Sequence, residues 1–211
     1  MNYCQFRNQT IKRMANAGGE GGGILPPEYQ QVEYIKSVSS YNEGTALIYI
    51  DTGVTYFADF EIECQKLNSS DAKFCGVASN SCIQTNGGKY SFYNTSSEYY
   101  VTNITATTRA KLRWQNNDIY IDDVHVTTQA KTPTNGTFKL FGAGGYGTNN
   151  YSNISVYSLK IWDNVGALIR DFIPCYRKSD NAVGLYDVIT GTFYGHTGGT
   201  NFSHLEAGQD V

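Results

Sequence analysis

From about residue 24 onward, polar and apolar residues alternate with a period of two in one short segment after another. In an extended strand this period places one face in a core and leaves the other in water. The alternating segments are residues 31–36, 46–50, 57–64, 110–114, 118–126, 137–141, 154–162 and 167–173. Residues 118–126 fit either a pair of strands or one bent strand. Turn-forming Asn, Gly and Thr separate the segments. We therefore predict an all-β fold, an antiparallel sandwich with very little helix.

The composition excludes several classes of protein. Of the 211 residues, 14% are aromatic, which is too many for a disordered chain. The 22 glycines follow no collagen period. A formal net charge of −3 gives no electrostatic footprint for nucleic acid. No apolar run approaches the length of a membrane-spanning helix. We expect neither nucleic acid nor a membrane among the partners.

The five cysteines suggest neither a disulfide framework nor a metal site. Their number is odd and their spacing wide, and the three histidines lie far from any cysteine pair. We expect buried free thiols, with a Cys75–Cys82 or Cys64–Cys75 bridge as the alternative. The first residues lack the apolar stretch of a signal peptide, so we expect synthesis and assembly in a reducing cytoplasm.

Residues 1–24 differ from the rest of the chain. Five of the six residues at 18–23 are glycine, which is typical of a flexible linker. The residues before it form a short arm whose apolar members, near helical spacing, are Tyr3, Phe6, Ile11 and Met14, and whose basic members are Arg7, Lys12 and Arg13. We interpret residues 1–24 as an anchoring arm and linker, with an unstructured tail as the alternative.

Several motifs resemble a known family. The first are Leu25-Pro-Pro-Glu-Tyr-Gln-Gln-Val-Glu-Tyr-Ile35 and Tyr49-Ile-Asp-Thr-Gly53. The later ones are Leu159-Lys-Ile-Trp-Asp163, Leu168-Ile-Arg-Asp-Phe-Ile-Pro-Cys175 and the stretch 184–194, which begins Gly-Leu-Tyr-Asp. Together they resemble laminin G-like, concanavalin A-like jelly-roll domains of bacteriophage virion proteins and of gut-bacterial surface proteins. The resemblance covers about residues 25–204, although residues 65–155 match only in the spacing of their expected strands.

The resemblance implies a jelly-roll β-sandwich head over residues 25–211. It further implies a non-enzymatic structural protein of a bacteriophage virion: a head fibre, a capsid decoration protein or a tail adhesin. The arm would bind other virion proteins, and the head would bind host or mucosal glycans. The virion would be assembled in the host cytoplasm. The alternative is a carbohydrate-binding module of a bacterial surface protein. A homo-oligomer stays open, and no cofactor is expected.

The stretch 184–194 also carries a prediction from its own residues. Gly184-Leu-Tyr-Asp and Thr190-Gly-Thr-Phe-Tyr194 predict two short strands joined by a glycine-containing turn. Such a hairpin would close the sandwich. Tyr186 and Asp187 are therefore expected to be structural residues.

Candidate catalytic groups are few. Glu61 and Glu63 share a strand face, but the Glu-x-Asp-x-x-Glu pattern of the hydrolases of this fold is absent, because Gln65 and Lys66 follow. Asp122 and Asp123 are adjacent, so in a strand they would point to opposite faces. There is no Gly-x-Ser-x-Gly motif and no P-loop. Hence we predict that the protein is not an enzyme.

Calcium is a weaker possibility. Laminin G-like domains often hold it through loop carboxylates, and the candidate ligands here are Asp118, Asp122 and Asp163. No EF-hand loop is present. We do not expect an essential metal.

The best candidate for binding is the loop 142–153. Tyr146 and Tyr151 could stack on a sugar face, and Asn149 and Asn150 could hydrogen-bond its hydroxyls. The segment 94–100 has the same character, and we expect it to be a loop as well. The alternative is that these residues simply form turns.

Overall fold

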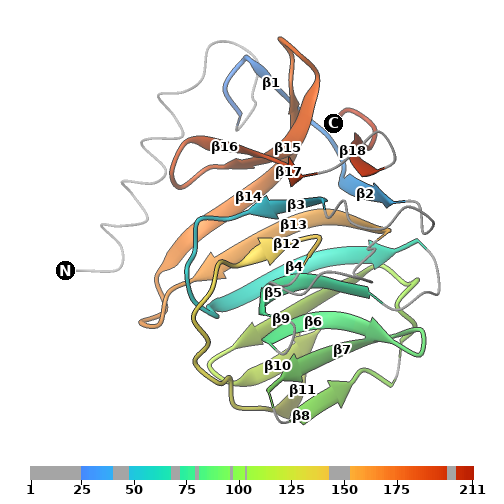
Figure 1. Ribbon diagram of the computed structural model, residues 1–211, viewed down its shortest axis with the longest axis vertical. Coiled ribbons are helices and arrows are strands. Elements are labelled where there is room, and N and C mark those ends of the chain that lie inside the picture. Colours follow the sequence, from blue (N-terminus) through green and yellow to red (C-terminus); the bar gives the residue numbers. More distant parts are fainter. Residues whose placement is uncertain are drawn as a thin grey trace.

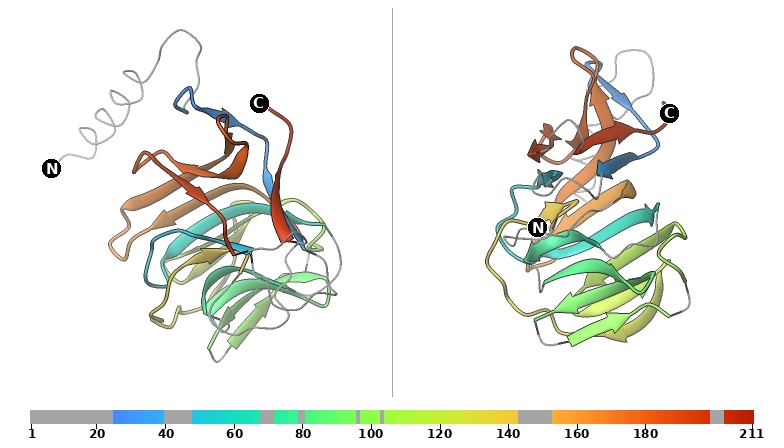
Figure 2. Two further views of the ribbon diagram at one scale, coloured as in Figure 1. Left: turned by 45° about the horizontal axis from the view of Figure 1, so that its top comes forward. Right: turned by 45° about the vertical axis from the view of Figure 1, so that its right-hand side comes forward.

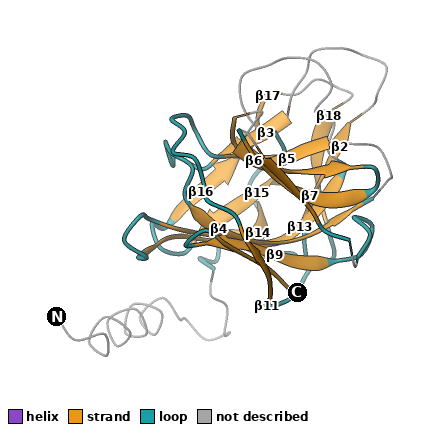
Figure 3. Ribbon diagram, turned by 90° about the horizontal axis from the view of Figure 1, so that it is seen from below, coloured by secondary structure: helices purple, strands orange, loops and turns teal. Residues whose placement is uncertain are grey.

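The computed structural model describes residues 25–39, 48–67, 72–78, 81–95, 97–102, 104–142, 153–198 and 203–211. In these residues all regular structure is β-strand, and all strand pairing is antiparallel (Figure 1). Two sheets pack face to face, as the view from below shows (Figure 3). The predicted all-β antiparallel sandwich is confirmed, while the strand order particular to a jelly roll stays a prediction. No helix capable of crossing a membrane occurs in the described segments.

The larger sheet has eleven strands among the described residues. Its main path runs β11 (Val124–Thr128), β10 (Asp118–Ile121), β9 (Ala110–Gln115), β4 (Asp59–Lys66), β13 (Ile154–Trp162), β14 (Leu168–Arg177), β15 (Ala182–Asp187) and β16 (Thr192–Gly195). Beside this path, β1 (Tyr29–Gln31) pairs with β14, β2 (Ile35–Ser39) pairs with β13, and β18 (Ser203–Ala207) pairs with β2. The part formed by β14, β15, β16 and β1 extends beyond the rest of the sandwich (Figures 1 and 2).

The smaller sheet has seven strands in the described segments. Its order is β17 (Thr197–Gly198), β3 (Ile48–Asp51), β12 (Lys139–Leu140), β5 (Ala72–Ala78), β6 (Ser81–Asn86), β7 (Lys89–Asn94) and β8 (Ser97–Tyr100). Strands from three distant parts of the sequence therefore lie side by side in one sheet.

Aromatic side chains join the two sheets through the core. Phe60 of β4 contacts Phe138, which precedes β12, with ring centroids 5.2 Å apart. Trp114 of β9 contacts Phe92 of β7, with centroids 5.6 Å apart. These four side chains are fully buried. Because aromatic rings bury large apolar areas, these cross-sheet contacts stabilise the packing of the two layers.

Two strand predictions, those for 31–36 and 94–100, need correction, and of the two alternatives for 118–126 the pair of strands is confirmed. Residues 31–36 form no continuous strand, because the chain leaves β14 after Gln31 and joins β13 at Ile35. Residues 118–126 are two strands, β10 and β11, joined at Asp122 and Asp123, whose φ angles are 49° and 65°. Both aspartates thus lie in a turn and not on strand faces. In the segment 94–100, residues 97–100 form strand β8 instead of a loop.

The predicted hairpin of residues 184–194 is present, while its closing of the sandwich stays a prediction. Strands β15 and β16 pair from Gly184 opposite Gly195 to Asp187 opposite Thr192. The turn between them contains Gly191, whose φ of 69° suits glycine.

Four cysteines, Cys64, Cys75, Cys82 and Cys175, are buried, and no disulfide joins any two of them. Strands β5 and β6 pair with Cys75 opposite Ile83 and with Cys82 opposite Gly76, so these two thiols point to opposite faces of the sheet. That register excludes the alternative Cys75–Cys82 bridge. Burial raises the pKa of Cys82 and of Cys175 to about 12. It also raises the pKa of Cys64 and of Cys75.

We expect these thiols to be unreactive in the folded protein, because the thiolate is the reactive form and burial suppresses it. In a Cys4→Ser variant, a chromogenic thiol reagent should give almost no signal until guanidinium is added, and should then report all four cysteines. A full signal before unfolding would contradict the burial, and a deficit after unfolding would reveal a disulfide.

Candidate functional site

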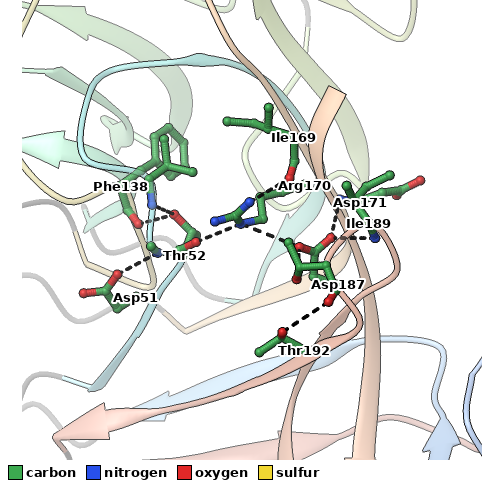
Figure 4. Close-up of polar contacts among 12 residues, drawn as sticks. Asp51, Thr52, Phe138, Ile169, Arg170, Asp171, Asp187, Ile189 and Thr192 are labelled. Carbon is green, nitrogen blue, oxygen red and sulfur yellow. Dashed lines mark hydrogen bonds and ion pairs between the residues drawn. The ribbon is translucent and has the colours of Figure 1, made fainter. Parts of the chain in front are cut away.

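Three of the motifs that carry the family resemblance meet between the two sheets (Figure 4). Thr52 follows β3 in the smaller sheet, whereas Arg170 and Asp187 belong to β14 and β15 of the larger one. The Nε of Arg170 donates to the backbone oxygen of Thr52 at 3.1 Å and lies 3.6 Å from Oδ2 of Asp187. This cluster links strands that are far apart in the sequence.

Asp187 is fully buried, and hydrogen bonds satisfy both its carboxylate oxygens. Its Oδ1 accepts from the backbone N–H groups of Asp171 and Ile189, at 2.9 and 3.1 Å. Its Oδ2 accepts from the hydroxyl of Thr190 at 2.6 Å. On the other side, Thr52 donates its hydroxyl to the backbone oxygen of Phe138 at 2.7 Å. Asp187 is therefore a structural residue, as expected. The motif residues of this cluster stabilise the fold, and their polar groups are engaged with one another.

The outer face of the smaller sheet is the candidate functional site, and we call it the polar face. The pairing register of the strands places on it the side chains that alternate with the core-facing ones. They are Tyr49, Asp51, Lys73, Gln84, Asn86, Lys89, Tyr93, Glu98, Tyr100 and Lys139. The core-facing residues of the same strands include Ile50, Leu140, Cys75, Ile83 and Phe92. All the polar-face side chains are at least partly exposed.

At one end of the polar face, a network of hydrogen bonds fixes Glu98. Its Oε1 accepts from the amide of Gln84 at 2.7 Å and from the hydroxyl of Ser91 at 2.6 Å. Its Oε2 accepts from the hydroxyl of Tyr100 at 2.6 Å, and Asn86 donates to that same hydroxyl at 3.0 Å. Burial acts to raise the pKa of Glu98, but these hydrogen bonds outweigh it and lower the pKa below its ordinary value. Glu98 is therefore ionised, and the side chains around it are held in place.

At the other end, Tyr49 and Lys139 lie on the adjacent strands β3 and β12. The ammonium of Lys139 lies 4.1 Å from the centroid of the Tyr49 ring, a cation–π contact. Asp51 is the cross-strand neighbour of Lys139, yet its Oδ1 accepts from the backbone N–H of Gly53 at 2.8 Å. A ring, an ammonium and a carboxylate thus share a small area.

The outer face of the larger sheet is different, because ion pairs engage many of its charges. Arg109 pairs with Glu63 at 2.7 Å and lies 3.6 Å above the ring of Tyr157. Arg113 pairs with Glu61 at 3.8 Å. The two glutamates considered as a catalytic pair thus form separate ion pairs with arginines of β9 and its preceding loop.

The sequence-predicted binding and anchoring residues fall outside the described residues. This holds for Tyr146, Asn149, Asn150 and Tyr151, and also for Tyr3, Phe6, Arg7, Ile11, Lys12, Arg13 and Met14. Those predictions stay predictions. At one end of the loop 142–153, Gly142 lies beside Tyr49: a Cβ atom on Gly142 would be 3.7 Å from that of Tyr49. The predicted loop thus begins next to the polar face.

The three aspartates considered as calcium ligands lie in separate turns. Asp118 accepts from Thr128 at 2.6 Å, Asp122 from the backbone N–H of Lys111 at 2.9 Å, and Asp163 from that of Ala167 at 2.8 Å. In the described part of the chain, no group of three or more His, Cys, Asp or Glu residues is arranged to hold a metal ion.

The sequence did not point to most of the polar-face residues as a binding site. Tyr49 was part of a motif, and Glu98 and Tyr100 were placed in a loop. The signal that could have found the others is the glycine turn at 86–88, which lies between two six-residue strands, the second of which contains tyrosine and phenylalanine.

A scan of protein-family profiles and a search of curated proteins give no match to this chain.

Proposed function

We propose that this protein is a non-enzymatic recognition protein of a bacteriophage virion, whose β-sandwich head binds carbohydrate on the polar face. The observation that carries the carbohydrate part is the chemistry of that face. Tyrosine rings can stack on the apolar side of a sugar ring. Fixed amides and carboxylates can hydrogen-bond its hydroxyls, and a few convergent polar groups are what orient a ligand.

The arrangement favours binding over catalysis. Glu98 is held ionised by its donors, which suits a hydrogen-bond acceptor better than a general acid. Glu61 and Glu63 lie on the other sheet and pair with Arg113 and Arg109.

The test is a glycan array probed with the whole chain and three variants. We expect Tyr49→Ala and Tyr100→Ala to weaken the hits by roughly fivefold each, because each removes a stacking surface worth about 1 kcal/mol. The matched control is Tyr120→Ala, which removes a partly exposed tyrosine from the outer face of the larger sheet. Hits that survive both polar-face variants but not the control would contradict the proposed site.

The virion part of the proposal rests on the motifs, the arm at residues 1–24 and the resemblance they carry. Deletion of residues 1–20 is expected to leave the head folded, because β1 begins only at Tyr29. It should also remove the protein from purified particles, as measured by immunoblot. Unchanged incorporation of the truncated protein would overturn the anchoring role. Absence of the full chain from particles, with glycan binding intact, would favour a bacterial surface module instead.

A further inference from the structure

The charges of the two outer faces are distributed unequally. On the larger sheet, Lys36 pairs with Glu206 at 2.7 Å, Lys111 pairs with Asp123, and Arg109 and Arg113 pair with glutamates of β4. On the polar face, Lys73, Lys89 and Lys139 have no carboxylate within 4.0 Å among the described residues. Lys160 of β13 and Lys178, just after β14, also have no carboxylate within 4.0 Å in the described part of the chain, but on the polar face this holds for all three lysines that the register places there.

The polar face carries a net positive charge, whereas the chain as a whole carries a net negative charge. The polar face has three lysines and two carboxylates, Asp51 and Glu98. The whole chain has a formal net charge of −3. Four polar side chains already surround one of those carboxylates, Glu98, directly or through Tyr100. Asp51 accepts from a backbone N–H. The lysines are therefore the groups left to bind a charged ligand.

The position of the lysines fits a sugar that carries an anionic group. Lys139 and Lys73 lie on the neighbouring strands β12 and β5, next to β3, which carries Tyr49. The Lys139 ammonium lies over one face of the Tyr49 ring, 4.1 Å from its centroid, so an anionic group bound by Lys139 would lie next to that ring. The uncharged groups Gln84 and Asn86 continue the face toward β8.

We infer that the polar face recognises an acidic polysaccharide, with carboxylate or sulfate groups bound at Lys139 and Lys73. This inference rests on the proposed function, since it names the class of carbohydrate for the same site. Nucleic acid is the less suitable anion. Its affinity comes from many phosphate contacts, and the polar face offers three lysines beside two carboxylates.

The experiment measures binding of the full chain to immobilised polygalacturonate, heparin, neutral dextran and a single-stranded DNA oligonucleotide by biolayer interferometry. We expect binding to polygalacturonate, heparin or both, weakening as sodium chloride is raised, because salt screens exposed charges. The double variant Lys73→Gln/Lys139→Gln should bind roughly fivefold to tenfold more weakly. The matched control is Lys160→Gln/Lys178→Gln, which removes one lysine of β13 and one that directly follows β14, and should bind as the parent does.

The results separate the two proposals. Binding to polygalacturonate alone or to heparin alone identifies the carboxylate or the sulfate form, and either supports the inference. Binding to dextran that is equal in the parent and the lysine double variant overturns the acidic class while the proposed function stands. Binding to none of the four probes, with no hit on the glycan array, overturns both. Tighter binding to the DNA oligonucleotide than to either acidic polysaccharide overturns the inference in favour of nucleic acid.

Discussion

Replacement of Asp187 by alanine is expected to lower the free energy of unfolding by about 3–5 kcal/mol, the range found when one partner of a buried ion pair is removed. The side chain of Asp187 is fully buried, and that of its partner Arg170 is only 18% exposed. The variant would also leave the backbone N–H groups of Asp171 and Ile189 without their acceptor. Since whole domains are stable by about 5–15 kcal/mol, this loss is a large share of the total.

The measurement is urea unfolding followed by tryptophan fluorescence. Asp187→Asn should lose less than Asp187→Ala, because the side-chain oxygen can still accept from the two backbone groups. The matched control is Asp180→Ala, which removes an exposed ion pair with Arg177 at 2.6 Å and should change stability far less, because solvent screens exposed pairs. Equal effects of Asp187→Ala and Asp180→Ala would show that the inter-sheet cluster does not stabilise the fold as argued.

Replacement of Gly184 by alanine is expected to destabilise the protein by about 3 kcal/mol, the upper part of the range for overpacking. A Cβ atom at this position would lie 2.4 Å from the backbone oxygen of Tyr194 and 2.7 Å from the ring of Phe193. The ring cannot move away freely, because Phe193 stacks on Tyr29 with centroids 5.3 Å apart. The first glycine of the Gly-Leu-Tyr-Asp motif is thus required by packing.

Gly195 offers a control directly across the sheet, since it is the strand partner of Gly184. A Cβ atom there would meet only Phe193 at 3.5 Å, an ordinary contact. We expect Gly195→Ala to leave the thermal midpoint unchanged or slightly raised, because alanine loses less backbone entropy than glycine on folding. A midpoint lowered as much by Gly195→Ala as by Gly184→Ala would mean that the clash at Gly184 is not the cause.

Regular alternation predicted those strands in which the apolar members all face the core. Residues 110–114 are an example: Leu112 and Trp114 are fully buried, and Lys111 and Arg113 point outward to their ion-pair partners. The hairpin of residues 184–194 was predictable for another reason, because its turn chemistry is local. The fold class could therefore be derived from the sequence.

Strands β5 to β8 were not singled out because their pattern is less regular. Thr85 and Ser91 are buried polar residues, which blur the contrast between the two faces. The pairing of β5 with β6 shifts register between Lys73 and Cys75 and again between Gly76 and Ala78. Each shift breaks the period of two on which the prediction depends.

The candidate site could not be assembled from sequence because it is built by long-range pairing. Tyr49 and Lys139 meet only because β3 pairs with β12, and Lys73 joins them only because β12 also pairs with β5. Sequence reasoning favoured loop residues, in which tyrosine and asparagine are locally conspicuous. The motifs it found most specific lead instead to the cluster of Thr52, Arg170 and Asp187.

The most direct test of the account is to map the binding surface by amide chemical shifts of the isotope-labelled chain, titrated with an oligosaccharide that binds on the array. The account predicts that the largest shifts lie in β3, β12 and β5 to β8, around Tyr49, Gln84 and Lys139. Shifts confined to the outer face of β4, β9, β10 and β13 would contradict it.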